Sequence, residues 1–397
     1  MNIKHNIRLI YIYAFMVHTL FMLPIIVLYF KDYIGLTFQQ FLIGEAVFAA
    51  VIIAMEVPSG WMSDVWSRKH TLAIGCFFAG LGYACLLFAR NFEQAILSQA
   101  FIGIGVAFNS GTVTTLIYDT LATNNKTHLY QKLEGKRHAI GLYAVALASV
   151  LGGILYQIDG RLPLIIDVIT IFIAMICALL MTEPERVKRK AEKSPIHDMI
   201  VTVKYALHGH KEIAAIILVS TVLFCSTKMF MWTQQPYMQY VGIPEEYFGY
   251  IIACGFLFSG FMGHVSHRFT KKFSNRQVIT FLALAGVILS ATAIVFPIAP
   301  SIIFILAIAG IWGFGFPFVQ NAINKHADPA RRATILSTLG LLISVAFIPA
   351  SIILGWFSEN YSILWGLGYL AVQLLFISII GLWWWKKSVN RSLNTAK

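Results

Sequence analysis

The chain alternates long apolar runs with shorter polar segments along nearly its whole length. Each run is long enough to cross the roughly 30 Å apolar layer of a bilayer as a helix. The twelve runs lie near residues 8–30, 39–62, 71–90, 94–118, 138–157, 162–182, 213–240, 247–267, 277–296, 301–324, 333–357 and 362–385. This pattern predicts an all-α membrane protein with twelve transmembrane helices.

Composition supports the membrane assignment and excludes a soluble protein. Of the 397 residues, 58% are hydrophobic and 12% are charged, whereas soluble domains carry about 25% charged residues. The 5 cysteines all fall within the apolar runs. We therefore interpret them as small apolar side chains and expect no disulfide framework.

The positions of the basic residues predict the orientation in the membrane. A net charge of +12 could indicate a nucleic-acid partner, but no nucleic-acid-binding motif is present. The 30 Lys and Arg instead occupy both termini and alternate polar segments, apart from Lys31, Arg90, Arg161 and Lys228. The positive-inside rule then predicts that both termini are cytoplasmic. We expect an integral protein of a bacterial inner (plasma) membrane, surrounded by lipid and not bound to nucleic acid.

One long polar stretch divides the runs into two equal sets. We expect an N-terminal six-helix bundle over residues 1–182, a cytoplasmic linker over 183–211 and a C-terminal six-helix bundle over 212–397. Within the linker, Ile196, Met199, Ile200 and Val203 recur at helical spacing. That spacing predicts an amphipathic helix at a membrane or protein surface.

A charged motif lies between the second and third runs. Gly60, Asp64, Arg68 and Lys69 follow the pattern G-x-x-x-D-x-x-G-R-K, with Ser67 in the place of the second glycine. This motif resembles the signature of the major facilitator superfamily, and the preceding Glu-x-Pro-Ser-Gly resembles its drug-exporting branches. The resemblance implies two pseudo-symmetric bundles that rock around a central cavity, and we expect a monomer.

The same motif predicts a cluster of ion pairs. Asp64 and Arg68 are four residues apart, as in a helical-turn ion pair, and Asp119 at the end of the fourth run could approach the same cation. The resemblance implies that these three residues hold the two halves in the outward-facing state. We call these three residues, together with Gly60, Lys69 and Glu56, the latch. The alternative is that they are ordinary solvated charges.

Ionisable groups at membrane depth are costly and mark candidate functional sites. Lys228 lies about 22 Å into the seventh run at 1.5 Å per residue, so a carboxylate, the ring of Trp232 or an anionic solute should stabilise it. Glu45, roughly 9 Å from the outer end of its run, is the candidate titrating carboxylate. His18 lies near the centre of the first run. The alternatives are a structural ion pair for Lys228, an interfacial acid for Glu45 and a packing role for His18; Asp167 ranks below all three.

The resemblance also implies that the first, fourth, seventh and tenth helices surround the cavity. These runs carry uncharged polar or aromatic candidates for solute contacts, namely Asn109, Gln234, Trp232, Trp312 and Gln320. Polar groups of this kind need partners inside a membrane. They therefore favour an aqueous cavity suited to a solute with both polar and apolar parts.

The sequence favours a proton gradient as the energy source. No G-x-x-x-x-G-K-[ST] loop is present, and we expect no cofactor. His264 and His267 lack an evident third ligand, so we expect no metal site. The predicted function is proton-coupled export of an amphipathic organic solute such as a drug, metabolite or siderophore. The alternatives are proton-linked uptake of a small solute and, remotely, a polytopic membrane enzyme, although no H-E-x-x-H motif or nucleophile with an assigned base supports the enzyme.

Overall fold

The computed structural model describes residues 3–184, 211–269, 273–326 and 332–395, and the regular structure in these ranges is helical. It contains 12 segments that are long and apolar enough to cross a membrane. The prediction of an all-α protein with 12 spans is confirmed. The predicted surface helix of the linker lies outside the described residues.

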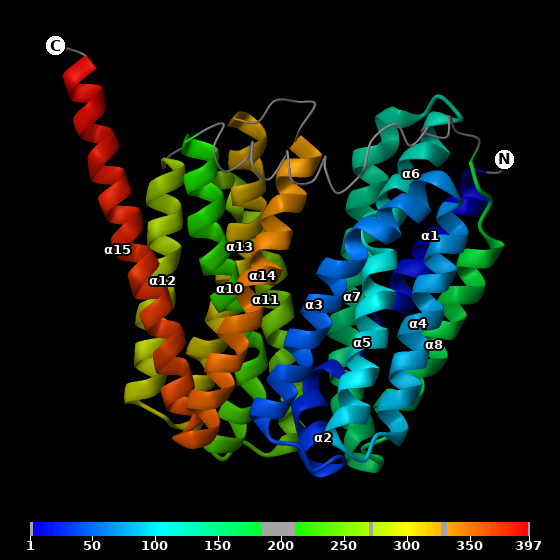
Figure 1. The fold of residues 1–397 in the computed structure, drawn as a ribbon, viewed down its shortest axis with the longest axis horizontal. Coiled ribbons are helices and arrows are strands. Elements are labelled where there is room, and N and C mark those ends of the chain that lie inside the picture. Colours follow the sequence, from blue (N-terminus) through cyan, green and yellow to red (C-terminus); the bar gives the residue numbers. More distant parts are fainter. Residues whose placement is uncertain (1–2, 185–210, 270–272, 327–331, 396–397) are drawn as a thin grey trace. The chain divides into compact units, whose positions relative to one another are not determined.

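The chain divides into two compact units, which are described separately. Unit 1 comprises Met1–Ile196 together with Glu245–Ala253, and unit 2 comprises His197–Pro244 and Cys254–Lys397. In each unit, long helices run side by side and are joined by short connections (Figure 1).

Unit 1 contains the first six spans. Its described helices are α1 (Ile3–His18), η1 (Leu23–Ile25), α2 (Ile26–Asp32), α3 (Phe38–Val65), α4 (Arg68–Phe88), α5 (Phe92–Asn109), α6 (Thr112–Ala122), η2 (Thr127–Leu129), α7 (Tyr130–Ile158) and α8 (Leu162–Leu180).

The remaining spans begin with α10. Their described helices are α10 (Lys211–Tyr240), η4 (Glu245–Tyr247), α11 (Phe248–Phe269), α12 (Asn275–Val295), η5 (Ala299–Ser301), α13 (Ile302–His326), α14 (Arg332–Asn360) and α15 (Ile363–Thr395).

Two spans of unit 1 are interrupted, which the apolar pattern does not predict. The first span breaks between α1 and η1, so His18 is the last residue of α1 and lies at the break. The fourth span breaks between α5 and α6, where Gly111 has a φ of 70°. An L side chain rarely adopts this left-handed conformation, so glycine permits the turn.

Small residues allow the helices of unit 1 to pack closely. A Cβ atom at Gly152 of α7 would lie 1.9 Å from the carbonyl oxygen of Phe21 in the broken first span. A Cβ atom at Gly105 of α5 would lie 2.6 Å from the backbone N of Ala79 in α4. The buried core between α1, α4, α6 and α8 includes Ile10, Leu72, Cys76, Leu116, Ile117 and Ala174.

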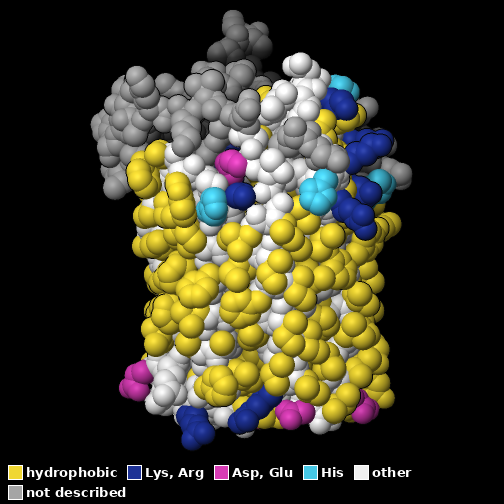
Figure 2. Space-filling model, turned by 90° about the vertical axis from the view of Figure 1, so that its right-hand side faces the viewer, with side chains coloured by type: hydrophobic (Ala, Val, Ile, Leu, Met, Phe, Trp, Pro, Cys, Tyr) yellow, Lys and Arg dark blue, Asp and Glu magenta, His cyan; other side chains and the backbone are white. Residues whose placement is uncertain are grey.

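Apolar side chains also cover the outside of the spans. Figure 2 shows a broad hydrophobic belt on one face, with charged side chains gathered at its two ends. On α8, the exposed residues include Ile165, Ile169, Ile173, Ile176 and Leu180. An exposed apolar belt between charged ends is the surface that a bilayer covers.

Several helices are longer than the apolar runs that predict them. α3 continues through Val65, and α4 begins at Arg68, so the motif forms the ends of two helices joined at Trp66 and Ser67. α7 begins at Tyr130, which places Arg137 inside a helix. The apolar run near 138–157 does not include Arg137, because hydropathy marks the apolar part of a helix and not its polar extension.

Candidate functional site

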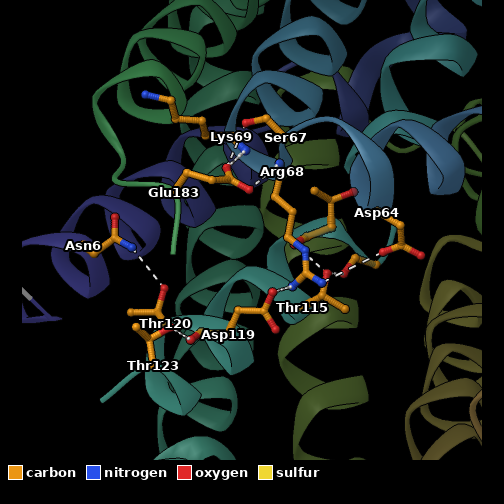
Figure 3. Close-up of polar contacts among 12 residues, drawn as sticks. Asn6, Asp64, Ser67, Arg68, Lys69, Thr115, Asp119, Thr120, Thr123 and Glu183 are labelled. Atoms are coloured by element: carbon orange, nitrogen blue, oxygen red, sulfur yellow. Dashed lines mark hydrogen bonds and ion pairs between the residues drawn. The ribbon is translucent and has the colours of Figure 1, made fainter. Parts of the chain in front are cut away.

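The latch residues of unit 1 meet at the ends of α3, α4 and α6 (Figure 3). The guanidinium of Arg68 lies 2.6 Å from the Asp119 carboxylate and 3.9 Å from that of Asp64. The Arg68 side chain is 9% exposed, whereas the Asp64 side chain is 51% exposed. Both predicted ion pairs are confirmed, and the shorter and more buried one joins Arg68 to Asp119.

A third carboxylate, that of Glu183, holds the start of α4. It accepts hydrogen bonds from the backbone N–H groups of Arg68 and Lys69, both at 3.0 Å. The Ser67 hydroxyl also donates to it at 2.9 Å. These contacts satisfy N–H groups that have no partner within the helix, and a negative charge at a helix N-terminus is favourable. Glu183 therefore fixes the position of Arg68 from the opposite side to Asp119.

Ser67 replaces the second glycine of the motif without straining the backbone. Its φ and ψ are −161° and 130°, an extended conformation open to any residue. Because the hydroxyl of Ser67 also binds Glu183, serine contributes a contact that glycine could not make.

Asn6 links three elements close to this cluster. Its side chain donates to the Thr120 hydroxyl at 3.0 Å and to the Thr182 carbonyl at 3.2 Å. The side-chain carbonyl oxygen of Asn6 accepts a hydrogen bond from the Thr182 backbone N–H at 3.0 Å. Asn6 is fully buried, so α1, α6 and the segment before Glu183 are held together by a satisfied polar group.

The other predicted latch residues occupy less central positions. Lys69 donates through Nζ to the Leu179 carbonyl at 3.4 Å. The backbone carbonyl of Glu56 accepts from the Ser59 hydroxyl at 3.1 Å. Gly60 lies within α3, and a Cβ atom there would meet nothing within 4 Å. Close packing within unit 1 therefore does not explain why the latch would need a glycine at position 60.

A second polar group in unit 1 surrounds the Tyr13 hydroxyl. Tyr13 of α1 donates a hydrogen bond to the side-chain oxygen of Asn109 at the end of α5. The Cys76 thiol lies 3.6 Å from the same hydroxyl. Asn109 thus has a partner on the first span, as the need to satisfy polar groups predicts. The sequence pattern does not predict these contacts of Tyr13 and Cys76, because it does not distinguish the two residues from ordinary packing residues.

An ion pair within α7 also contacts α6. Arg137 contacts Glu134 through Nε and Nη2, at 2.9 and 2.6 Å. The Thr114 hydroxyl donates to the same glutamate at 3.2 Å. His18 is nearby, since a Cβ atom at Gly141 would lie 3.0 Å from its imidazole ring. The first span, α6 and α7 therefore share a group of polar and ionisable side chains.

Glu45 lies between α3 and α5. Its carboxylate accepts a hydrogen bond from the Gln99 side chain at 2.8 Å. Glu45 is 5% exposed and Gln99 is 3% exposed. Glu45 is therefore enclosed by protein, which its depth along the helix does not predict, because depth does not reveal which face of a helix is packed.

Lys228 of unit 2 lies over an aromatic ring. Its ammonium nitrogen is 4.2 Å from the centroid of the Phe347 ring on α14. At 1.5 Å per residue, Lys228 lies about 22 Å from Ile213 and about 18 Å from Tyr240, the two ends of its span. A cation–π contact lowers the cost of placing an ammonium group at this depth. The predicted aromatic neighbour was Trp232, on the same helix, whereas this contact comes from another helix.

Three aromatic rings pack one turn of α10 before Lys228. The Trp312 and Phe316 rings of α13 stack with centroids 5.3 Å apart and an interplanar angle of 6°. Phe224 of α10 meets each of them edge-on, at 5.3 and 5.5 Å. Phe224 and Lys228 are four residues apart and share one face of α10. A cation and an aromatic surface are therefore adjacent.

The remaining candidates of unit 2 differ in exposure. Trp232 and Gln234 are buried, at 7% and 4% exposure. Gln320 is half-buried near the end of α13. The participation of these three residues in solute binding stays a prediction.

Comparison with known proteins assigns the chain to a family. The model of the Major Facilitator Superfamily matches residues 9–318 and 216–397, so the chain belongs to this superfamily of membrane transporters. The prediction of a secondary transporter, and not an enzyme, is thereby confirmed.

The chain is similar to two curated relatives and to a solved structure. The chain is 24% identical to the uncharacterized MFS-type transporter YxaM of Bacillus subtilis (strain 168), over 86% of each chain. It is 22% identical to the class H tetracycline resistance protein of Pasteurella multocida, over 84% of each. The crystal structure of the nucleoside transporter NupG has a TM-score of 0.79 at 13% identity, over 96% of this chain and 98% of that one. The last similarity shows the fold alone.

Proposed function

We propose that the protein is a proton-coupled exporter of amphipathic organic solutes that carry an anionic or zwitterionic group. The observation that carries this proposal is the position of Lys228 in the middle of a span, over the Phe347 ring at 4.2 Å. An ammonium group at this depth attracts a negative charge strongly, because little water screens it.

The aromatic cluster of Phe224, Trp312 and Phe316 supports the amphipathic part of the proposal. Its rings lie one helical turn from Lys228, with centroids 5.3–5.5 Å apart. Aromatic faces bind flat or apolar parts of a solute while a few polar groups fix its orientation. The similarity to a tetracycline resistance protein favours export over uptake.

In the proposed orientation, both termini and the latch are on the cytoplasmic side. The end of unit 1 with the latch carries Lys4, Arg8, Lys69, Lys126 and Lys132, whereas the other end carries Lys31, Arg90 and Arg161. This asymmetry follows the positive-inside rule. A fluorescent protein fused to the C-terminus should fold and fluoresce in the cytoplasm, and a non-fluorescent fusion with an active periplasmic reporter would contradict the orientation.

Transport into inverted membrane vesicles tests the function. When the interior of these vesicles is more acidic than the medium, protons leaving the vesicles should drive accumulation of an anionic amphipathic solute chosen by a thermal-shift screen, and a protonophore should abolish it. Matched cationic and neutral analogues should accumulate less. Solute uptake by right-side-out vesicles with an inward proton gradient would instead support the alternative, proton-linked uptake.

A further inference from the structure

Asp167 of α8 binds the turn that connects the two parts of the broken first span. One carboxylate oxygen accepts a hydrogen bond from the Phe21 backbone N–H at 2.8 Å, and the other accepts from that of Met22 at 2.9 Å. Within an unbroken helix, these N–H groups would bind carbonyl oxygens four residues earlier. At the break, a side chain from another span takes over that role.

The break around Asp167 is tightly enclosed. Asp167 is 2% exposed and Met22 is 2% exposed. Gly152 of α7 faces the Phe21 carbonyl, and a Cβ atom there would lie 1.9 Å away. The carboxylate therefore lies in a packed site in which a hydrogen bond is worth more than it is at the surface.

Few ionisable groups surround this carboxylate. None of the ion pairs found among the described residues includes Asp167. Tyr83 of α4 interacts electrostatically with Asp167 and also with Glu45 of α3. At the break, α1 carries the ionisable side chain of His18, whose Nδ1 is 2.7 Å from the Ala14 carbonyl oxygen. The residue of α7 that faces the break is Gly152, which has no side chain to ionise.

The protonation state of Asp167 decides how many hydrogen bonds it can accept. The ionised carboxylate offers one oxygen to each of the two N–H groups of the turn. Binding a proton converts one oxygen into a hydroxyl group, which is a weaker acceptor and itself a donor. The proton thereby weakens one of the two contacts that hold this turn against α8, and no covalent bond of the chain changes.

We propose that Asp167 binds the coupling proton, and that this proton loosens the junction between α1 and the η1–α2 segment. The inference rests on the proposed proton-coupled export. Asp167 lies about 8 Å along α8 from Leu162, at the end of unit 1 opposite the latch. In the proposed orientation this end faces outward, the side that supplies the proton. The proton binds in the outward-facing state after solute has left, and it is released to the cytoplasm in the inward-facing state before the next solute is exported.

The test compares Asp167→Asn with the wild-type protein in vesicles. Asparagine resembles the protonated acid in shape and retains one acceptor oxygen. D167N should lose proton-driven accumulation of the solute while it keeps solute exchange in the absence of a gradient. The matched control is Asp159→Asn, which removes an exposed acid that precedes the same helix and should leave both activities unchanged.

These outcomes separate the inference from the proposed function. If the wild-type protein shows no proton-driven accumulation, the proposed function fails, and the inference fails with it. If the wild-type protein accumulates solute and D167N does so with the same pH profile, the role of Asp167 is refuted while the proposed function stands.

Hydrogen exchange in the wild-type protein tests the inference even where D167N does not fold. After correction for intrinsic exchange, the Phe21 and Met22 amides should lose protection as the pH falls. The control is the Gln40 amide, which donates a hydrogen bond to the non-titrating Thr37 hydroxyl at 3.3 Å. The protection of the Gln40 amide should stay constant. Constant protection at Phe21 and Met22 would overturn the proposal.

Discussion

The carboxylate of Glu183 accepts a hydrogen bond from the backbone N–H of Arg68 at 3.0 Å, although 115 residues separate them in the chain. This contact fixes the start of α4 against the segment that follows α8. The guanidinium of Arg68 then lies 2.6 Å from Asp119. The cluster consequently depends on a backbone contact as well as on its ion pairs.

Removing the Glu183 carboxylate should destabilise unit 1. We expect Glu183→Ala to cost about 1 kcal/mol, the usual cost of losing a helix N-cap, because three donors at the start of α4 lose their shared acceptor. Thermal unfolding in detergent measures the loss. The control is Glu93→Ala, which removes an exposed acid from the first turn of α5. Equal shifts for both variants would contradict a specific role of Glu183.

Asp119 and Asp64 should contribute unequally to conformational switching. Asp119→Asn removes the short, buried ion pair to Arg68, whereas Asp64→Asn removes the pair at 3.9 Å with the exposed carboxylate. We expect D119N to reduce the maximal transport rate more than D64N does, with solute affinity nearly unchanged in both. Transport kinetics together with binding measured on purified protein would show this. A D119N protein that lost affinity but switched normally would refute the latch.

Replacing Lys228 should weaken binding of anionic solutes. A hydrogen bond to a charged group contributes about 1.5–3 kcal/mol, so Lys228→Gln should lower affinity at least about ten-fold, and a neutral analogue should bind equally well to both proteins. Isothermal titration with purified protein would measure these affinities. Lys325→Gln is the control, since Lys325 is an exposed cation at the end of α13. Equal loss of affinity for anionic and neutral solutes would argue against a charge contact.

Two glycines of α7 should respond oppositely to alanine. At Gly152 the new Cβ would lie 1.9 Å from the Phe21 carbonyl oxygen, so Gly152→Ala should destabilise the protein by at least about 1–3 kcal/mol. At Gly135 nothing lies within 4 Å, so Gly135→Ala should stabilise it by about 0.5–1 kcal/mol. Melting temperatures of the two variants provide the comparison. An unchanged melting temperature for Gly152→Ala would show that the first span can shift away from α7.

The spans could be predicted from the sequence because hydropathy is a local property. The interruptions could not be predicted equally well. Gly111 offers a local signal for the break before α6, since its φ of 70° favours glycine. Pro24 offers a local signal for the break after His18, but the side chain that satisfies the N–H groups of this turn comes from Asp167, 145 or 146 residues away.

The candidate site shows the same distinction between local and distant contacts. Asp64 and Arg68 are one helical turn apart, so their spacing predicts their ion pair. The contacts of Glu183 with α4 and of Lys228 with the Phe347 ring join residues far apart in the chain. Such contacts follow from how helices pack, and one sequence does not encode them as a periodic pattern.

The hydrogen-bond ladders of the first and fourth spans of unit 1 and of the corresponding helices α10 and α13 are interrupted by different means. In unit 1, the first and fourth spans are each divided by a turn, so bending is concentrated at a few peptide groups. In unit 2, α10 and α13 are continuous but contain Pro236 and Pro317, each of which removes one rung of the hydrogen-bond ladder. A turn concentrates bending at one point, whereas a proline weakens a short section of a continuous helix. Equivalent spans of this transporter therefore differ in stiffness despite their shared architecture.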